Sequence, residues 1–292
     1  MPDNQYKSLL PLRQVVGDNG LLSRHGFSKK LGQNFLLDLD ITRRIAKIAA
    51  PLKGCTVIEI GPGPGGLTRA ILELEPDKVF AIEKDSKCID ALAELVKLSE
   101  GVLSIVEGDA LKTNFQSLVD GSMKIIANLP YNIGTQLLIN WLHNLSNISS
   151  LTLMFQKEVA LRITAEHGNK DYGRLSVLCQ YLCDVTLVFD LPPHVFKPAP
   201  KVFSSVIHLV PKKLEKKDLD LVPFIEKMTG AAFGQRRKML RVSLKSVFPE
   251  GDLNKAFETL NIAPTERAEN LSVEQFVSLA QFLSSLDSIP RG

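Results

Sequence analysis

The sequence predicts an α/β protein, a doubly wound and mostly parallel sheet with an antiparallel terminal strand, followed by a small all-helical region. Short apolar runs alternate with helical patterns between residues 41 and 155, as in parallel strands joined by right-handed crossovers. Two later β-rich runs lie too close together for a crossover helix. After a charged linker at residues 212–217, no further strand pattern occurs.

The predicted elements follow one another in a regular order. Residues 1–25 have no clear period and read as a loose arm, and apolar residues at helical spacing predict a helix over residues 41–52. Parallel strands are expected at residues 56–60, 78–82, 102–106, 124–127 and 151–155. The runs at residues 185–191 and 202–209, joined by a proline-rich segment, are expected to pair antiparallel.

The composition, with 45% hydrophobic and 23% charged residues and a net charge of +3, is that of a globular protein. Its length allows two domains, which we assign to residues 1–211 and 212–292. The four cysteines fit small buried thiols, and no histidine has zinc-like spacing to them, so no metal is expected. Without a secretory signal or an apolar run of about 18 residues, we expect a cytoplasmic protein with no membrane contact.

A glycine-rich turn follows the first predicted strand, in the segment Val57–Thr68. Gly61, Gly63 and Gly66, together with Glu83 at the end of the second strand, match the dinucleotide-binding pattern. The glycines allow close backbone approach to a ligand, and the acid can accept hydrogen bonds from ribose hydroxyls. By itself this motif fits a nicotinamide enzyme as well as an S-adenosylmethionine enzyme.

Two further acids favour S-adenosylmethionine over a nicotinamide cofactor. Glu59 lies two residues before the first glycine, where an acid is awkward beside a pyrophosphate but useful near the ammonium of a methionine moiety. Asp109 follows the third strand, where its carboxylate can accept from an adenine amine. Each acid alone would also fit a solvated strand end.

The segment Asn128–Tyr131, Asn-Leu-Pro-Tyr, ends the fourth predicted strand. A rigid turn here fixes polar and stacking groups at the carboxyl edge of the sheet, where open α/β sheets bind ligands. Asn128 and the Leu129 carbonyl can accept hydrogens from an exocyclic amine, while Tyr131 can stack on a base. The combination suits chemistry on the N6 amine of adenine, and Phe196 is either a second stacking platform or a plug packed against the sheet.

Several segments carry a family resemblance. They are Lys30–Leu36, the glycine turn, Glu83, Gly108-Asp109, Asn128–Tyr131, Phe196–Val202 and Phe233–Lys238. With them the chain resembles, over nearly its whole length, the bacterial small-subunit rRNA adenine N6,N6-dimethyltransferases. The glycine turn is specific only to the class, whereas the other segments together are hard to explain otherwise.

The resemblance implies a Rossmann-like class I methyltransferase sheet and an enzyme that dimethylates two adjacent adenosines near the 3′ end of 16S rRNA. It implies a role in maturation of the small ribosomal subunit, with an immature subunit as the partner and S-adenosylmethionine as the cofactor, and we expect a monomer. Cofactor contacts would fall to Asn34, Leu36, Gly61, Glu83, Asp109 and Asn128, and the reacting base to Asn128, Leu129, Pro130, Tyr131 and Phe196. Without the resemblance, residues 33–36 would pass for a loop with a helix cap.

Basic side chains cluster in two places where RNA phosphates can bind. The apolar stripe Phe233, Leu240, Leu244 and Val247 predicts one helix over residues 233–248 with a basic flank. On an arbitrary helix such a flank is usually only solvated. The predicted RNA contacts are Lys29, Lys30, Lys197, Lys201, Arg236, Arg237, Lys238, Arg241 and Lys245.

Three alternatives remain at this point. A nicotinamide dehydrogenase would explain the glycine turn but not Asn128–Tyr131. A DNA adenine N6 methyltransferase has a similar tetrapeptide at a strand end. A ribosome-assembly factor would act mainly by binding an immature subunit, with methylation secondary.

Overall fold

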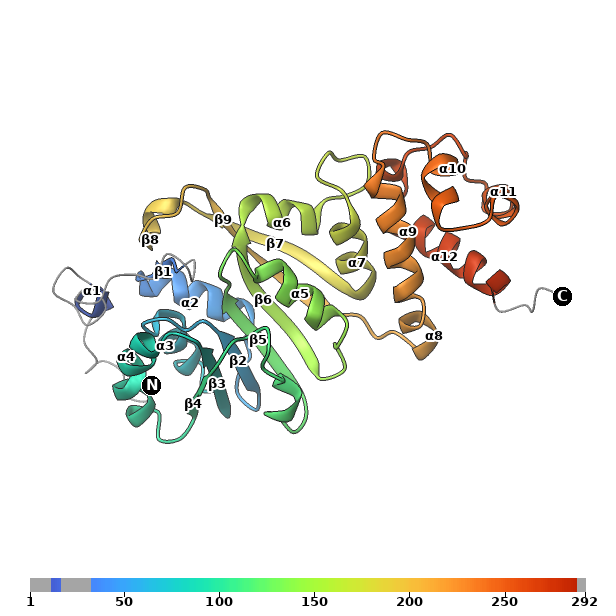
Figure 1. Cartoon of the computed structure of the whole chain (residues 1–292). Helices are drawn as coiled ribbons and strands as arrows, with labels where there is room; N and C mark the ends of the chain where they lie inside the picture. The colour runs from blue at the N-terminus through green and yellow to red at the C-terminus, as the bar shows by residue number, and fades with distance from the viewer. Residues whose placement is uncertain (1–11, 17–32, 288–292) are drawn as a thin grey trace. The chain divides into compact units, whose positions relative to one another are not determined.

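The computed structural model of the chain describes residues 12–16 and 33–287 (Figure 1). Contacts group these residues into two compact units. The first holds the described residues up to Ala160 together with Thr186–Pro211, and the second holds Leu161–Val185 and the described residues from Lys212 onward. One of these divisions falls at residue 212, where we expect the domain boundary. Residues 161–185 belong to the helical unit, although the sequence predicts them as part of the sheet domain.

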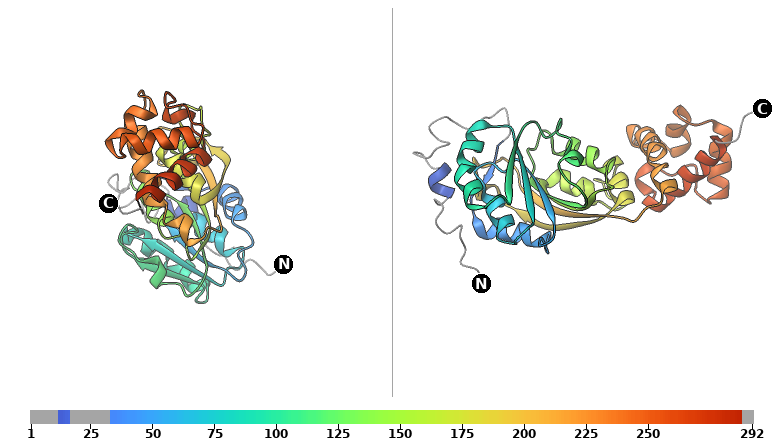
Figure 2. Two further views of the ribbon diagram at one scale, coloured as in Figure 1. Left: turned by 90° about the vertical axis from the view of Figure 1, so that its right-hand side faces the viewer. Right: turned by 90° about the horizontal axis from the view of Figure 1, so that it is seen from below.

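A seven-stranded sheet is the centre of the first unit (Figures 1 and 2). In spatial order its strands are β4 (Leu103–Glu107), β3 (Lys78–Glu83), β2 (Thr56–Ile60), β5 (Met123–Asn128), β6 (Ile148–Gln156), β9 (Ser204–Pro211) and β7 (Cys183–Leu191). The strands from β4 to β6 are parallel. The last strand of the chain, β9, runs antiparallel to β6, so the predicted mixed sheet is confirmed, with β9 inserted between β6 and β7.

The order of the strands creates a switch point between β2 and β5. From β2 the chain proceeds to β3 on one side, and from β5 it proceeds to β6 on the other. Ile60 and Ala127 are register partners at this point. Because crossovers diverge from a switch point, a crevice opens at the carboxyl ends of the two strands, where open α/β sheets bind ligands.

Helices cover the sheet, so the central strands β2 and β5 are buried along most of their length. The helices of the first unit are α1 (Leu12–Val16), α2 (Leu39–Ile48), α3 (Gly66–Leu72), α4 (Ser86–Leu98), α5 (Gly134–Leu142) and the beginning of α6 (Lys157–Thr164). The helix predicted over residues 41–52 is α2, which starts earlier because the Asp38 carboxylate caps it. It ends before Ala50, which precedes Pro51 and is therefore biased away from helix.

A second, two-stranded sheet joins parts of the chain that are far apart in sequence. Strand β1 (Phe35–Leu36) pairs antiparallel with β8 (Phe196–Lys197), and Leu36 lies opposite Phe196. The same hydrophobic cluster contains Leu36 and Phe196 together with Ile45 of α2 and Ile71 of α3. This pairing, which the sequence did not predict, fixes the segment around Asn34 beside the main sheet.

The second unit is helical. It contains the end of α6, α7 (Arg174–Leu182), α8 (Lys216–Leu219), α9 (Val222–Gly234), α10 (Leu240–Ser243), α11 (Glu250–Thr259) and α12 (Val273–Asp287), and the first residues of β7 group with it. Helix α7 packs against α9 and α12, which explains why residues 161–185 group with this unit. The Phe233 ring lies 5.7 Å from the rings of both Tyr172 and Phe276.

The single helix predicted over residues 233–248 is wrong. Helix α9 ends at Gly234, and Met239 forms an isolated bridge with Arg267 before α10 begins. The Leu240 amide donates to the Glu266 carbonyl, a bond that a continuous helix would not allow. Leu240 and Leu244 of the apolar stripe are still buried. The pattern therefore predicted the burial of these side chains correctly, but not the break in the helix.

Candidate active site

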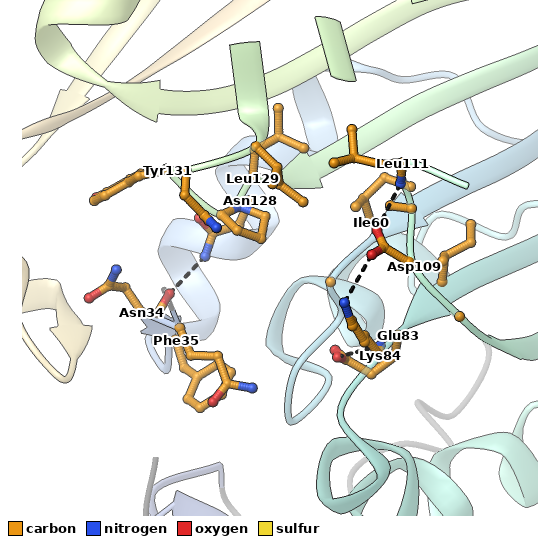
Figure 3. Close-up of a pocket in the computed structure, with 18 residues that line it drawn as sticks. Asn34, Phe35, Ile60, Glu83, Lys84, Asp109, Leu111, Asn128, Leu129 and Tyr131 are labelled. Atoms are coloured by element: carbon orange, nitrogen blue, oxygen red, sulfur yellow. Dashed lines mark hydrogen bonds and ion pairs between the residues drawn. The ribbon is translucent and has the colours of Figure 1, made fainter. Parts of the chain in front are cut away.

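A cavity of about 190 Å³ lies at the carboxyl edge of the sheet, at the switch point. Its walls come from the segment before β1, from the ends of β2, β3 and β5, and from the turn after β4. Figure 3 shows Asn34, Asn128 and Tyr131 on one side of this cavity and Glu83, Lys84 and Asp109 on the other. The predicted site residues among its lining are Asn34, Gly61, Glu83, Asp109, Asn128, Leu129, Pro130 and Tyr131.

On the first wall, the turn after β5 holds an amide beside an aromatic ring. The Asn128 Nδ2 atom donates to the Asn34 carbonyl at 2.9 Å, which leaves the Oδ1 atom of that amide as its acceptor. The hydroxyl oxygens of Tyr131 and Ser204 lie 2.6 Å apart, so the ring is tied to the start of β9. Burial raises the pKa of Tyr131, so its phenol stays neutral near pH 7.

On the opposite wall, Glu83 is a buried carboxylate held by backbone amides. Its Oε2 atom accepts from the Gly63 amide at 3.1 Å, and its Oε1 atom accepts from the amides of Lys84 and Asp85. Burial nevertheless raises the pKa of Glu83. The Oε2 atom, which accepts only one of these bonds, retains acceptor capacity. The Gly63 amide serves this acid and is therefore not a free donor for a pyrophosphate.

Asp109 stands beside Glu83 and is paired with a cation. Its Oδ2 atom lies 2.9 Å from the Lys84 Nζ atom, and its Oδ1 atom accepts from the Leu111 amide. The hydrogen bond from Lys84 is the main cause that lowers the pKa of Asp109, so the group is an ionised acceptor. Lys84 was not among the predicted site residues, although its place directly after the acid that ends β3 was a usable signal.

The glycine turn allows the segment containing β1 to approach the sheet closely. Gly63 has a φ of +55°, and a Cβ atom there would lie 2.6 Å from the Phe35 ring. At Gly66 a Cβ atom would collide with the Leu36 carbonyl oxygen. Both positions therefore require glycine for steric reasons. Leu36 itself does not line the main cavity but a smaller one beside it.

That smaller cavity also contacts Glu59, which is fully buried. Within the described residues, neither carboxylate oxygen of Glu59 has a hydrogen-bond partner. Burial raises the pKa of Glu59 to about 8, and the Thr68 hydroxyl, which is near the carboxylate but outside hydrogen-bond geometry, offsets only part of that rise. A buried acid without a partner is costly, and a cationic group reaching it through the cavity would relieve that cost.

Of the two interpretations of Phe196, the structure supports the one in which its ring packs against the sheet. Phe196 is 4% exposed, lies in the hydrophobic cluster with Leu36 and does not line the cavity. Phe196 lies opposite Leu36 where β8 pairs with β1, and both side chains belong to the buried cluster. The prediction of Phe196 as a second stacking platform is corrected accordingly, because its ring belongs to the core and does not face the cavity.

The predicted phosphate contacts fall into three groups. Lys29 and Lys30 lie outside the described residues. In the first unit, Lys197 is half-buried in β8 and Lys201 is exposed. In the second unit, Arg236 pairs with Glu269 and Lys245 pairs with Glu250. Lys245 is nevertheless exposed, as are Arg237, Lys238 and Arg241.

Within the described residues, no three His, Cys, Asp or Glu side chains gather as a metal ion would require. The same part of the chain contains no helix with the length and apolar character needed to cross a membrane. The described cysteines are free, and Cys88, Cys179 and Cys183 are buried.

A parallel sheet with an inserted reversed strand, and a glycine turn with an acid at its switch point, define a Rossmann-like protein of the class I methyltransferase fold. The family model for ribosomal RNA adenine dimethylase matches residues 24–285. The chain therefore belongs to the ribosomal RNA adenine dimethylase family.

Relatives and solved structures agree with this assignment. Ribosomal RNA small subunit methyltransferase A of Sinorhizobium medicae is 54% identical over 278 residues, which cover 94% of this chain and 98% of that protein. The protein of the same name from Agrobacterium fabrum is 54% identical over 281 residues, with the same shares covered. A dimethyladenosine transferase structure from Plasmodium falciparum has a TM-score of 0.71 at 28% identity and covers 83% of this chain and 94% of its own. The 23S rRNA methyltransferase ErmE has a TM-score of 0.68 at 25% identity, with 86% and 100% covered.

Proposed function

We propose that this protein transfers methyl groups from S-adenosylmethionine to the N6 amines of two adjacent adenosines near the 3′ end of 16S rRNA. The family supports the reaction class. The observation that carries the proposal is the wall at the end of β5, where an oriented Asn128 amide and the Tyr131 ring face two acids across a cavity. This arrangement offers acceptors for an amine next to a surface for a flat ring.

The residues present fit S-adenosylmethionine. Glu59 is a buried carboxylate without a partner beside the glycine turn, and the methionine ammonium is a group that it can bind. Glu83 can accept from the ribose hydroxyls, and Asp109 from the adenine amine. Close approach at Gly63 and Gly66 holds the segment after Asn34 beside the glycine turn, where it would contact the same ligand. Bound there, the cofactor supplies a methyl group carried by a sulfonium.

The protein's part in the reaction is to orient an amine. The N6 lone pair of adenine is delocalised into the ring, so the amine is a poor nucleophile. Asn128 and the Leu129 carbonyl would accept its hydrogens and favour a pyramidal nitrogen with an available lone pair. Alignment, and acceptors placed where positive charge develops, would lower the barrier, and no strong general base is needed because the N6 proton becomes acidic once the methyl group has arrived and can leave to water.

The target base must leave its helix to enter the cavity, at a cost of a few kcal/mol. Stacking on Tyr131 returns roughly 1 to 3 kcal/mol. A second transfer requires that the monomethyl product be accepted again, and this demands room in the cavity rather than further catalytic groups. We propose the immature small subunit as the substrate particle and a monomer as the active form.

Mass analysis of rRNA tests the proposal. Immature small subunits, naked 16S rRNA and a DNA oligonucleotide are each incubated with the protein and methyl-labelled S-adenosylmethionine. We expect N6,N6-dimethyladenosine at two adjacent positions in rRNA, formed at least tenfold more slowly with Asn128→Ala. Label on the DNA alone, or at another atom of the rRNA, would overturn the proposal.

A further inference from the structure

The first residue before β9 carries an exposed aromatic ring. Phe203 is 49% exposed, the largest fraction among the exposed large hydrophobic side chains in the described part of the chain, and its neighbour Val202 is 43% exposed. The core does not need this ring, in contrast to Phe196, which is buried seven residues earlier. An exposed apolar patch rimmed by polar groups is typical of an interaction site.

Phe203 precedes a residue that contacts the cavity wall, although neither Phe203 nor Ser204 lines the cavity itself. The next residue, Ser204, has its hydroxyl oxygen 2.6 Å from that of Tyr131, which lines the cavity. Since neighbouring Cα atoms are about 3.8 Å apart, the Phe203 backbone is one residue away from the side chain that holds Tyr131. The Phe203 carbonyl accepts from the Lys157 amide at 2.9 Å, and Ser204 is the register partner of Gln156 at the end of β6. The ring therefore extends from a backbone that two elements hold in place.

One lysine side chain lies near the ring, and a second lysine is close to it in sequence. The Lys157 Nζ atom lies 6.0 Å from the ring centroid of Phe203 and pairs with the Asp190 carboxylate, which also accepts from the Ser205 hydroxyl. Lys201, two residues before the ring, is exposed. A flat apolar surface with an ammonium group near it matches a nucleotide, whose base is flat and whose phosphate is anionic.

We propose that Phe203 is a stacking platform for the nucleotide next to the adenosine in the cavity, with Lys157 and Lys201 beside its phosphates. This inference rests on the proposed function. When one of two adjacent adenosines turns into the cavity, the other loses a stacking partner, and an aromatic ring close to the cavity wall replaces it. Phe203 thus holds whichever adenosine is waiting, and so assists both transfers.

The test uses the full-length protein and a short RNA that contains both adenosines, with 2-aminopurine in place of the waiting one. Stacking quenches 2-aminopurine fluorescence. We expect quenching on binding to the unaltered protein, retained in Phe203→Trp and lost in Phe203→Leu. In methylation assays Phe203→Leu should raise KM for RNA about tenfold, which corresponds to about 1.4 kcal/mol, and leave the cofactor Kd within about twofold.

Leu187→Ala is the matched control, because it removes another exposed apolar side chain of the same sheet; it should alter neither the fluorescence nor KM. Equal quenching and equal KM for Phe203→Leu and the unaltered protein would overturn the inference. If the unaltered protein makes no dimethyladenosine, the proposed function fails, and the fluorescence of the bound RNA still decides whether Phe203 stacks a base.

Discussion

The Asn128 side chain donates to the backbone carbonyl of Asn34, a residue 94 positions earlier in the chain. This bond connects the end of β5 to the segment that leads into β1, and it fixes which end of the amide is an acceptor. The same segment approaches the glycine turn closely enough that Gly63 and Gly66 leave no room for a side chain. Amide orientation and cofactor enclosure are therefore coupled through residues 34–36.

Replacing Asn128 should separate binding from transfer. Asn128→Ala removes the acceptor for the amine, so we expect methyl transfer to fall at least tenfold in single-turnover assays, an effect of about 1.4 kcal/mol or more on the barrier. Cofactor binding, measured by calorimetry, should be weakened but detectable. Asn144→Ala, at an exposed position two residues after the end of α5, is the control and should keep the full rate. An unchanged single-turnover rate in Asn128→Ala would remove this residue from the mechanism.

A methyl group at Gly66 should damage the cofactor site through the backbone. The added Cβ atom of Gly66→Ala collides with the Leu36 carbonyl oxygen, so β1 must shift. We expect cofactor affinity to fall at least tenfold and stability to fall by about 1 to 3 kcal/mol. Gly251→Ala lies in a helix with open space around it and should instead stabilise by about 0.5 to 1 kcal/mol. Equal cofactor affinity in the two variants would contradict this argument.

Strand periods and local motifs predicted the main sheet well. The first predicted strand coincides with β2, and the others differ from the observed strands by a few residues at their ends. Because parallel strands bring their carboxyl ends to one edge, the sequence also brought Glu83, Asp109 and Asn128 together.

Long-range pairings were not predictable in the same way. The pairing of β1 with β8 joins two-residue strands about 160 positions apart, and no periodicity can be read from two residues. Phe196 belongs to this pairing and is buried in the hydrophobic cluster, so its burial could not be predicted from the local pattern either. The helix predicted over residues 233–248 was wrong for a related reason. The helical period reflects the burial of Leu240 and Leu244, whereas contacts with residues 264–267 set the turn at residues 235–239.

Glu59 should make the stability of the cofactor-free protein depend on pH. Burial raises the pKa of this acid from 4.5 to about 8, so the folded state retains a proton that the unfolded chain releases. The stabilisation is complete below pH 4.5 and is lost as pH rises toward 8, by about 1.4 kcal/mol for each pH unit between the two pKa values. Glu83, whose pKa is also raised by burial, contributes in the same direction.

Chemical denaturation at pH 5 and pH 8 measures this effect. Glu59→Gln retains a neutral side chain of similar shape, so its free energy of unfolding should fall less over this range than that of the unaltered protein. If the methionine ammonium binds Glu59, cofactor binding at pH 7 should release a proton from the unaltered protein and not from the variant. Calorimetry in buffers of different ionisation enthalpy detects that proton, and equal pH dependence in both proteins would refute the assignment.

The hydroxyl of Tyr131 should affect KM for RNA through its contact with Ser204. Tyr131→Phe keeps the ring but loses the contact of 2.6 Å, and Ser204→Ala loses the same contact from the other side. Each change should raise KM for RNA a few-fold, and the double variant should be no worse than either single one, because both remove one interaction. Tyr131→Ala, which also removes the ring, should be clearly worse than Tyr131→Phe. Additive effects of the two single changes would show that the hydroxyl contact is not their common cause.

The exposed cations of the second unit should act on RNA through charge alone. Arg237 and Arg241 are exposed and lie near α10, and an Arg that contacts a phosphate releases a counterion when RNA binds. The slope of log K against log salt is about −0.7 for each such contact on single strands. Changing both residues to Gln should therefore make that slope shallower by about 1.4, with the order of preference among RNA sequences unchanged.

Lys53→Gln is the matched control, because Lys53 is an exposed cation just before β2, at the edge of the sheet away from the cavity. Its slope should equal that of the unaltered protein. Binding titrations between 50 and 300 mM salt, about a sixfold range, resolve a difference of this size. If all three proteins give the same slope, Arg237 and Arg241 are solvated cations without a phosphate partner. The candidates for phosphate contacts are then Lys157, Lys197 and Lys201 of the first unit. Because those three lysines belong to the unit that holds the cavity, changing them should also raise KM, whereas loss of Arg237 and Arg241 should weaken RNA binding without altering the single-turnover rate at saturating RNA.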